Sequence, residues 1–131
     1  MIDVSDGLLA DLGHVAAASG VQVDIDSSKL TVGTALREAA ASLAIAPPAA
    51  TTGAAGSVTP VSPAAFPAGS PHAVALEWVL TGGEDHALVA AFPPGTALPA
   101  RWRVIGEVRD GTGVTVDGAA HQGPGGWQHF R

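Results

Sequence analysis

Two carboxylates and a hydroxyl stand close together near the start of the chain. The segment DVSDGL contains Asp3, Ser5 and Asp6, and apolar residues alternate with them as in a strand end. Hard oxygen ligands suit Mg²⁺, which proteins hold with one or two carboxylates and substrate phosphates. A helix beginning here would add backbone N–H groups that favour phosphate. Helix capping by Ser5 or Asp6 is the simpler interpretation of either residue, but it leaves Asp3 unexplained.

A second acidic group follows a pair of glycines later in the chain. In the stretch TGGEDH, Glu84 and Asp85 come directly after Gly82 and Gly83. Consecutive glycines permit a sharp turn and a close approach by a ligand. A carboxylate at such a turn can accept hydrogen bonds from an amino-bearing or cationic substrate, although a solvated acidic turn is the simpler alternative. His86 has no second histidine at metal-ligand spacing, so we interpret it as a packed or surface residue.

The elements expected to position these motifs mix helices with strands. A helix is predicted from a cap at Ser5 or Asp6 to about Ser19, with Gly20 as its stop and Asp11 at the edge of its apolar face. Further helices are predicted at 34–44 and 73–80, and strands at 21–26, 86–92, 102–108 and 114–116. The turn DGTG predicts a late hairpin between the last two strands. Together these elements predict an α+β fold, a layered sandwich with a mixed, mostly antiparallel sheet and packed helices.

The middle of the chain differs in composition from the rest. Residues 46–71 are dominated by alanine, proline, glycine, serine and threonine, a pattern that does not sustain regular structure. Such a long stretch is unusual inside a compact domain, and we expect a low-complexity, flexible loop. With 131 residues in all, the chain has the length of one domain with its own core.

Charge and composition narrow the classes of partner. The net charge is −6 and the six basic residues form no patch, which argues against nucleic acid and anionic membranes as partners. No stretch approaches the roughly 20 apolar residues of a membrane-spanning helix. The chain has no cysteine, which excludes disulfides and thiolate metal sites and fits a cytoplasmic protein.

The two motifs and the end of the chain together resemble the thiamine-monophosphate kinase family. The C-terminal half of that family typically opens with M-D-[IV]-S-D-G-L and later carries G-G-E-D-Y-E-L, to which residues 3–8 and 82–88 correspond. The tail GWQHF at residues 126–130 is similar to the family's terminal Gly-aromatic-x-His-Phe. The chain departs from the family pattern at His86, which replaces a tyrosine, and at Ala87, which replaces a glutamate.

The resemblance implies a fold and a role for the chain as a whole. It implies that residues 1–131 are a single C-terminal domain of the AIR synthetase (PurM)-like superfamily, with the N-terminal ATP- and Mg²⁺-binding domain absent. Family members transfer the γ-phosphoryl of ATP to thiamine monophosphate, giving thiamine diphosphate, and the intact enzyme is expected to be a homodimer. The isolated chain is expected to be inactive, because the family's active site lies between domains.

The resemblance also implies roles for individual residues. Asp3 and Asp6 correspond to Mg²⁺ ligands, and Ser5 to an ATP contact. Glu84 corresponds to a contact with the substrate, and Trp127 to a ring that stacks on thiamine. No catalytic residue is assigned beyond metal and substrate positioning, in keeping with a phosphoryl transfer that depends on positioning and charge neutralisation.

Two other interpretations remain open at the level of sequence. The chain could come from a related PurM-like enzyme that acts on another small substrate, because one fold supports several specificities. It could also be a non-catalytic domain that depends on a partner and exposes an apolar surface when alone. Packing of Trp127 in a core or interface is the simpler alternative to stacking on a ligand.

Overall fold

The computed structural model describes residues 1–45, 70–84 and 86–121. It divides the chain into two compact units, one formed by residues 1–31 and 77–131 and the other by residues 32–76. The chain contains both helices and strands, and most of the strand pairs are antiparallel. The predicted α+β class is therefore confirmed. Within the described residues, no helix combines the length and the apolar character needed to cross a membrane.

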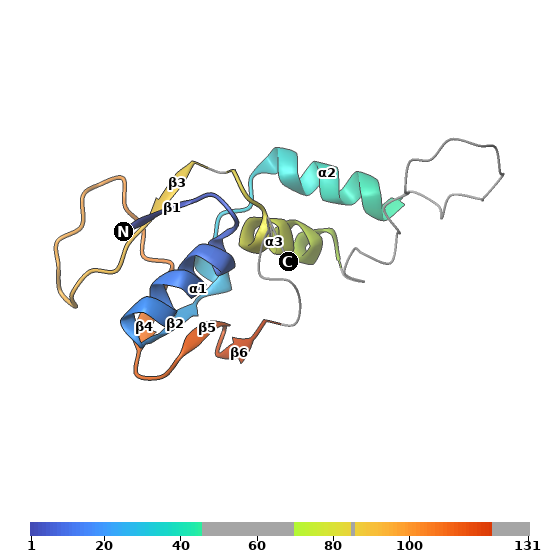
Figure 1. The fold of residues 1–131 in the computed structure, drawn as a ribbon. Helices are drawn as coiled ribbons and strands as arrows, with labels where there is room; N and C mark the ends of the chain where they lie inside the picture. The colour runs from blue at the N-terminus through green and yellow to red at the C-terminus, as the bar shows by residue number, and fades with distance from the viewer. Residues whose placement is uncertain (46–69, 85, 122–131) are drawn as a thin grey trace. The chain divides into compact units, whose positions relative to one another are not determined.

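The larger sheet of the first unit has four strands in the order β4-β2-β5-β6 (Figure 1). Strand β2 (Gln22–Ile25) pairs antiparallel with β4 (Gly106–Arg109) and parallel with β5 (Gly113–Val116). Strand β6 (Ala119–Ala120) pairs antiparallel with β5. The first long strand of the chain is therefore inserted between two strands that follow each other about 80 residues later.

The late hairpin lies at a different turn from the one predicted. Because β2 separates β4 from β5, the DGTG segment connects two strands that do not pair with each other. The tight hairpin joins β5 to β6 through Asp117 and Gly118, whose φ angles are 53° and 78°. Two successive residues with positive φ are the signature of the type I′ turn, which favours Asp-Gly.

A second, two-stranded sheet contains the start of the chain. Strand β1 (Ile2–Val4) pairs antiparallel with β3 (Ala87–Val89), so that Asp3 lies opposite Leu88 and Val4 opposite Ala87. The sequence predicted a longer strand at 86–92. The observed strand is shorter, and it is followed by the consecutive prolines 93 and 94. Proline has no backbone N–H to donate to a neighbouring strand.

Helix α1 (Leu8–Ser19) supplies half of the buried apolar side chains described in the first unit and contacts β1, β2 and β5 (Figure 1). The buried apolar side chains of this unit are those of Val4, Leu8, Leu9, Leu12, Ala16, Val23, Ile25 and Leu80. As predicted, Gly20 ends the helix in the left-handed conformation, with φ 66°. The predicted start is wrong, because Gly7 occupies the N-cap position in place of Ser5 or Asp6.

The remaining elements follow the predicted order. Helix α2 (Thr34–Ile45) lies in the second unit, and helix α3 (Pro71–Thr81) begins in that unit and ends in the first. A short 3₁₀ helix, η1 (Ser27–Lys29), follows β2. The predicted low-complexity loop at 46–71 lies outside the described residues except for its last two positions.

Candidate functional site

The first acidic motif occupies the connection between β1 and α1. Asp3 lies in β1 with an exposed side chain, Ser5 is exposed, and Asp6 is half-buried. The Ser5 hydroxyl lies 3.5 Å from Oδ1 of Asp6, at the limit of a hydrogen bond. The alternation of buried Val4 with exposed Asp3 and Ser5 is the pattern that the sequence predicted for this strand end.

The second acidic motif packs directly on the first, backbone against backbone. The amide of Glu84 donates to the carbonyl of Ser5 at 2.9 Å. A Cβ atom on Gly83 would overlap that same carbonyl oxygen, and one on Gly7 would lie 2.7 Å from the carbonyl oxygen of Thr81. The glycines of both motifs are therefore required for this close approach, and it brings the two acidic segments to one place in the first unit.

Glu84 and His86 adopt an unusual backbone conformation at this turn. Their φ angles are 65° and 49°, in the left-handed region that residues other than glycine rarely occupy. Both side chains are exposed. Positive φ in non-glycine residues is concentrated at functional turns, so the conformation is consistent with a binding role for Glu84.

Asp11 is a residue of this site that the sequence did not single out. Its side chain lies in the first turn of α1 and is 3% exposed. Its Oδ2 accepts hydrogen bonds from the amides of Ser5, at 2.9 Å, and Asp6, at 3.1 Å. A signal was present in the sequence, because Asp11 lies three residues after Leu8 and so on the buried side of the helix, where a charge requires partners. The same contacts engage two amides that could otherwise have faced a phosphate.

The donor set of the first motif fits Mg²⁺ when part of the coordination comes from elsewhere. Asp3, Ser5 and Asp6 offer carboxylate and hydroxyl oxygens, the ligands that this ion prefers. In the described portion of the chain, no three carboxylate or histidine groups come close enough to hold a metal ion alone. A Mg²⁺ ion at this motif would therefore need phosphate oxygens, water or other protein groups to complete its coordination.

One predicted site residue has no described position. Trp127 lies outside the described residues with the rest of the tail GWQHF, as does Asp85 of the second motif. Of the five predicted site residues, the structure gives positions for Asp3, Ser5, Asp6 and Glu84, and it brings the segments that carry them together.

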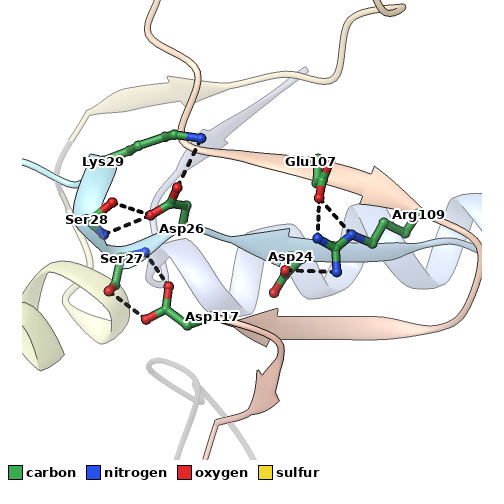
Figure 2. A network of polar contacts seen from close by, with 8 residues as sticks. All are labelled: Asp24, Asp26, Ser27, Ser28, Lys29, Glu107, Arg109 and Asp117. Carbon is green, nitrogen blue, oxygen red and sulfur yellow. Dashed lines mark hydrogen bonds and ion pairs between the residues drawn. The ribbon is translucent and has the colours of Figure 1, made fainter.

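A separate polar cluster lies around β2, and its centre is Asp24 (Figure 2). Oδ1 of Asp24 accepts hydrogen bonds from the Thr115 hydroxyl at 2.6 Å and from the Gly118 amide at 2.9 Å. Its Oδ2 forms an ion pair with Arg109 at 3.2 Å, and Arg109 also pairs with Glu107. These partners, Thr115 foremost, lower the pKa of Asp24 below its ordinary value. Because these partners lie in β4, in β5 and in the turn that follows β5, Asp24 ties β2 to both of its neighbouring strands.

The end of β2 carries a second part of the same cluster (Figure 2). Asp117 accepts from the amide of Ser27 at 2.9 Å and from its hydroxyl at 2.6 Å. Asp26 accepts from the amide of Ser28 at 3.1 Å and forms an ion pair with Lys29 at 3.0 Å. The hydrogen bonds from Ser28, and then Lys29, lower the pKa of Asp26. Both aspartates fix the chain as it leaves β2.

A groove of about 330 Å³ runs along this cluster. It is lined by Asp24, Ile25, Asp26, Lys29, Val104, Gly106, Glu107, Arg109 and Asp117. None of the four placed motif residues lines it. Its other charged residues form ion pairs with one another, and Asp117 accepts hydrogen bonds from Ser27. We therefore assign the groove to the scaffold.

The chain is similar to known proteins both in sequence and in structure. No protein-family model matches the chain. A thiamine-monophosphate kinase of Mycobacterium tuberculosis is 45% identical over 132 aligned residues, which are 99% of this chain and 31% of the relative. A thiamine-monophosphate kinase of Aquifex aeolicus is 31% identical over 98% of this chain and 33% of its own length.

Solved structures give the same result. A structure of AaThiL complexed with AMPPCP and TMP matches 98% of this chain and 33% of its own, with a TM-score of 0.64 and 31% sequence identity. A structure of the thiamine-monophosphate kinase from Aquifex aeolicus matches 93% of this chain and 32% of its own, with a TM-score of 0.59. The chain is therefore related to the thiamine-monophosphate kinases, and it spans about a third of the length of the relatives it matches.

Proposed function

We propose that this chain supplies the C-terminal part of an enzyme that phosphorylates thiamine monophosphate to thiamine diphosphate with ATP. The observation that carries the proposal is the packing of the two acidic motifs, in which the Glu84 amide donates to the Ser5 carbonyl at 2.9 Å. The same two motifs carried the resemblance to the family. Relatives named for this activity match 98–99% of the chain, and one relative was solved with AMPPCP and TMP.

In this proposal Asp3 and Asp6 hold Mg²⁺, and Ser5 contacts ATP. Bound Mg²⁺ supplies charge neutralisation between phosphate groups, which otherwise repel each other. The support is the donor set. Asp3 and Ser5 are exposed; Asp3 is held in strand β1, and the backbone of Ser5 is held by the Asp11 carboxylate and by the Glu84 amide. Because the loop is already ordered, its oxygens can bind a metal–nucleotide complex without the entropic cost of ordering the loop on binding.

We assign Glu84 and Trp127 to the other reactant, thiamine monophosphate. Glu84 is exposed in a left-handed backbone conformation one residue after Gly83, so its carboxylate can accept hydrogen bonds from an amino group. An indole at Trp127 would stack on the charged thiazolium ring. Trp127 lies outside the described residues, and its proposed role rests on the family resemblance alone.

The remaining requirements of the reaction are assigned to parts outside this chain. The relatives are about three times as long, so we propose that an N-terminal domain provides further nucleotide and Mg²⁺ contacts. We further propose that the complete enzyme is a homodimer in the cytoplasm. The isolated chain is then expected to be inactive, because its described residues contain no group of three side chains that could hold a metal ion by themselves.

The decisive experiment is a chimera in which this chain replaces the matching third of the Mycobacterium tuberculosis relative. With ATP, Mg²⁺ and thiamine monophosphate, the chimera should form thiamine diphosphate, because the replaced segment is 45% identical. Asp3→Asn and Asp6→Asn should each reduce turnover by about tenfold or more, as expected when a metal ligand loses its charge.

A matched control is Asp26→Asn, which removes a carboxylate that accepts from Ser28 outside the motif and should leave turnover unchanged. A folded chimera without activity would refute the proposed function. Normal turnover in both Asp3→Asn and Asp6→Asn would refute the metal assignment.

A further inference from the structure

We propose that Asp11 is the positioning residue of this site, setting the conformation of the loop that carries Ser5 and Asp6 directly after strand β1. This inference rests on the proposed function, because it takes that loop as the metal- and nucleotide-binding segment. Asp11 itself is 3% exposed and is directed at backbone amides, so it is not placed to touch a ligand.

The contacts of Asp11 explain how a charge is tolerated on the apolar side of α1. Burial of a carboxylate is unfavourable unless hydrogen bonds replace its hydration. Here one oxygen, Oδ2, accepts from two consecutive amides at 2.9 and 3.1 Å. Within the described residues no lysine or arginine forms an ion pair with Asp11. The carboxylate therefore acts on the backbone of the loop, and its first-turn position in the helix is favourable for a negative charge.

Ser5 is the point at which this constraint reaches the second motif. Its amide donates to Asp11, and its carbonyl accepts from the amide of Glu84 at 2.9 Å. The backbone of Ser5 is thus held from both sides, once by the first turn of α1 and once by the glycine turn. A change at Asp11 is transmitted to Asp6 directly, through the second amide, and to Glu84 through Ser5.

A simple helix-capping role does not account for this geometry. A capping side chain stands before the helix and accepts from amides within its first turn. Asp11 stands inside the helix and reaches back to residues that precede it, while Gly7 holds the N-cap position. The hydrogen bonds order the loop more directly than they order the helix.

The test has one arm that does not depend on catalysis. In the 131-residue chain, amide hydrogen exchange at Ser5 and Asp6 is measured by NMR for the wild type, Asp11→Ala, Asp11→Asn and Leu12→Ala. Asp11→Ala should accelerate exchange at these two amides by about tenfold or more relative to the change at other α1 amides, because a charge-assisted acceptor is lost. Asp11→Asn keeps an acceptor oxygen and should restore most of the protection.

Leu12→Ala is the matched control for stability. Leu12 is the buried neighbour of Asp11 in α1, 6% exposed, and its truncation weakens the core without removing a hydrogen-bond acceptor from the loop. It should accelerate exchange throughout the unit with no selective effect at Ser5 and Asp6. Equal acceleration at all amides in Asp11→Ala, as in Leu12→Ala, would overturn the positioning role.

The second arm uses the chimera described above. Asp11→Ala should raise the Mg²⁺ concentration for half-maximal turnover by about 10- to 100-fold, the range typical of residues that orient metal ligands. Asp11→Asn should recover most of this loss, and Leu12→Ala should leave the Mg²⁺ dependence unchanged. An active chimera whose Mg²⁺ dependence is unaltered by Asp11→Ala overturns the inference and leaves the proposed function standing. An inactive wild-type chimera refutes the proposed function, and the exchange arm then decides the role of Asp11 alone.

Discussion

Replacement of Gly83 by alanine should separate the two acidic motifs and destabilise the first unit. Its φ angle is not in the left-handed region, so the expected effect comes entirely from close approach. An added Cβ would overlap the Ser5 carbonyl oxygen and would lie 3.4 Å from its carbonyl carbon and 3.5 Å from that of Asp6. These are backbone atoms and cannot rotate away, so the chain must shift and the Glu84–Ser5 hydrogen bond must lengthen or break.

The expected cost follows from two contributions. Overpacking against fixed atoms typically costs about 1–3 kcal/mol, and a lost backbone hydrogen bond adds about 1 kcal/mol. We therefore expect Gly83→Ala to lower the free energy of unfolding by about 2–4 kcal/mol in urea denaturation. The opposite sign is expected for Gly13→Ala, because Gly13 lies inside α1 and an added Cβ there meets no atom within 4 Å. Alanine should stabilise that position by about 0.5–1 kcal/mol.

The pair of variants separates close packing from general effects of glycine replacement. Both changes add the same methyl group and restrict the unfolded chain in the same way. If Gly83→Ala were as stable as the wild type, or if both variants changed stability in the same direction, the close packing of the two motifs described above would be wrong.

Two further predictions concern the larger sheet. Thr115→Val removes the leading hydrogen bond to Asp24 and should raise its pKa toward the ordinary value of 3.8, which an NMR titration of the carboxyl carbon will measure. Because folding lowers the pKa of Asp24, its carboxylate stabilises the folded state above about pH 4, and this stabilisation is lost as the pH falls through the folded pKa. Thr115→Val should therefore make the free energy of unfolding less sensitive to acid. Gly118→Ala places a side chain at φ 78°, with open space around it, and should destabilise the β5–β6 hairpin by about 1–2 kcal/mol in thermal or urea unfolding. Gly33→Ala, at a position without positive φ and also with open space, should lack this penalty.

Local sequence alone determined much of the fold and the identity of the candidate site. The period of the apolar residues and the glycine stop at Gly20 predicted α1 to within a few residues. Alternation predicted that Asp3 and Ser5 would be exposed beside buried Val4. The two glycine-containing motifs and their order indicated the resemblance to the family. Each motif is a contiguous run of residues, so it can be recognised from the sequence without knowledge of the fold.

Tertiary structure decided which segments meet. A period of two shows which face of a strand is buried, but it does not choose the neighbouring strand, so nothing in the sequence indicated that β2 would separate β4 from β5. The sequence indicated that Asp11 would be buried, but it did not show the hydrogen-bond partners of Asp11 or of Asp24. Each carboxylate is satisfied by amides or side chains that chain folding brings to it, across 5 and 6 residues for Asp11 and across 91 and 94 residues for Asp24. The approach of Gly83 to Ser5 likewise depends on the pairing of β1 with β3, a contact that forms only when distant parts of the chain pack together.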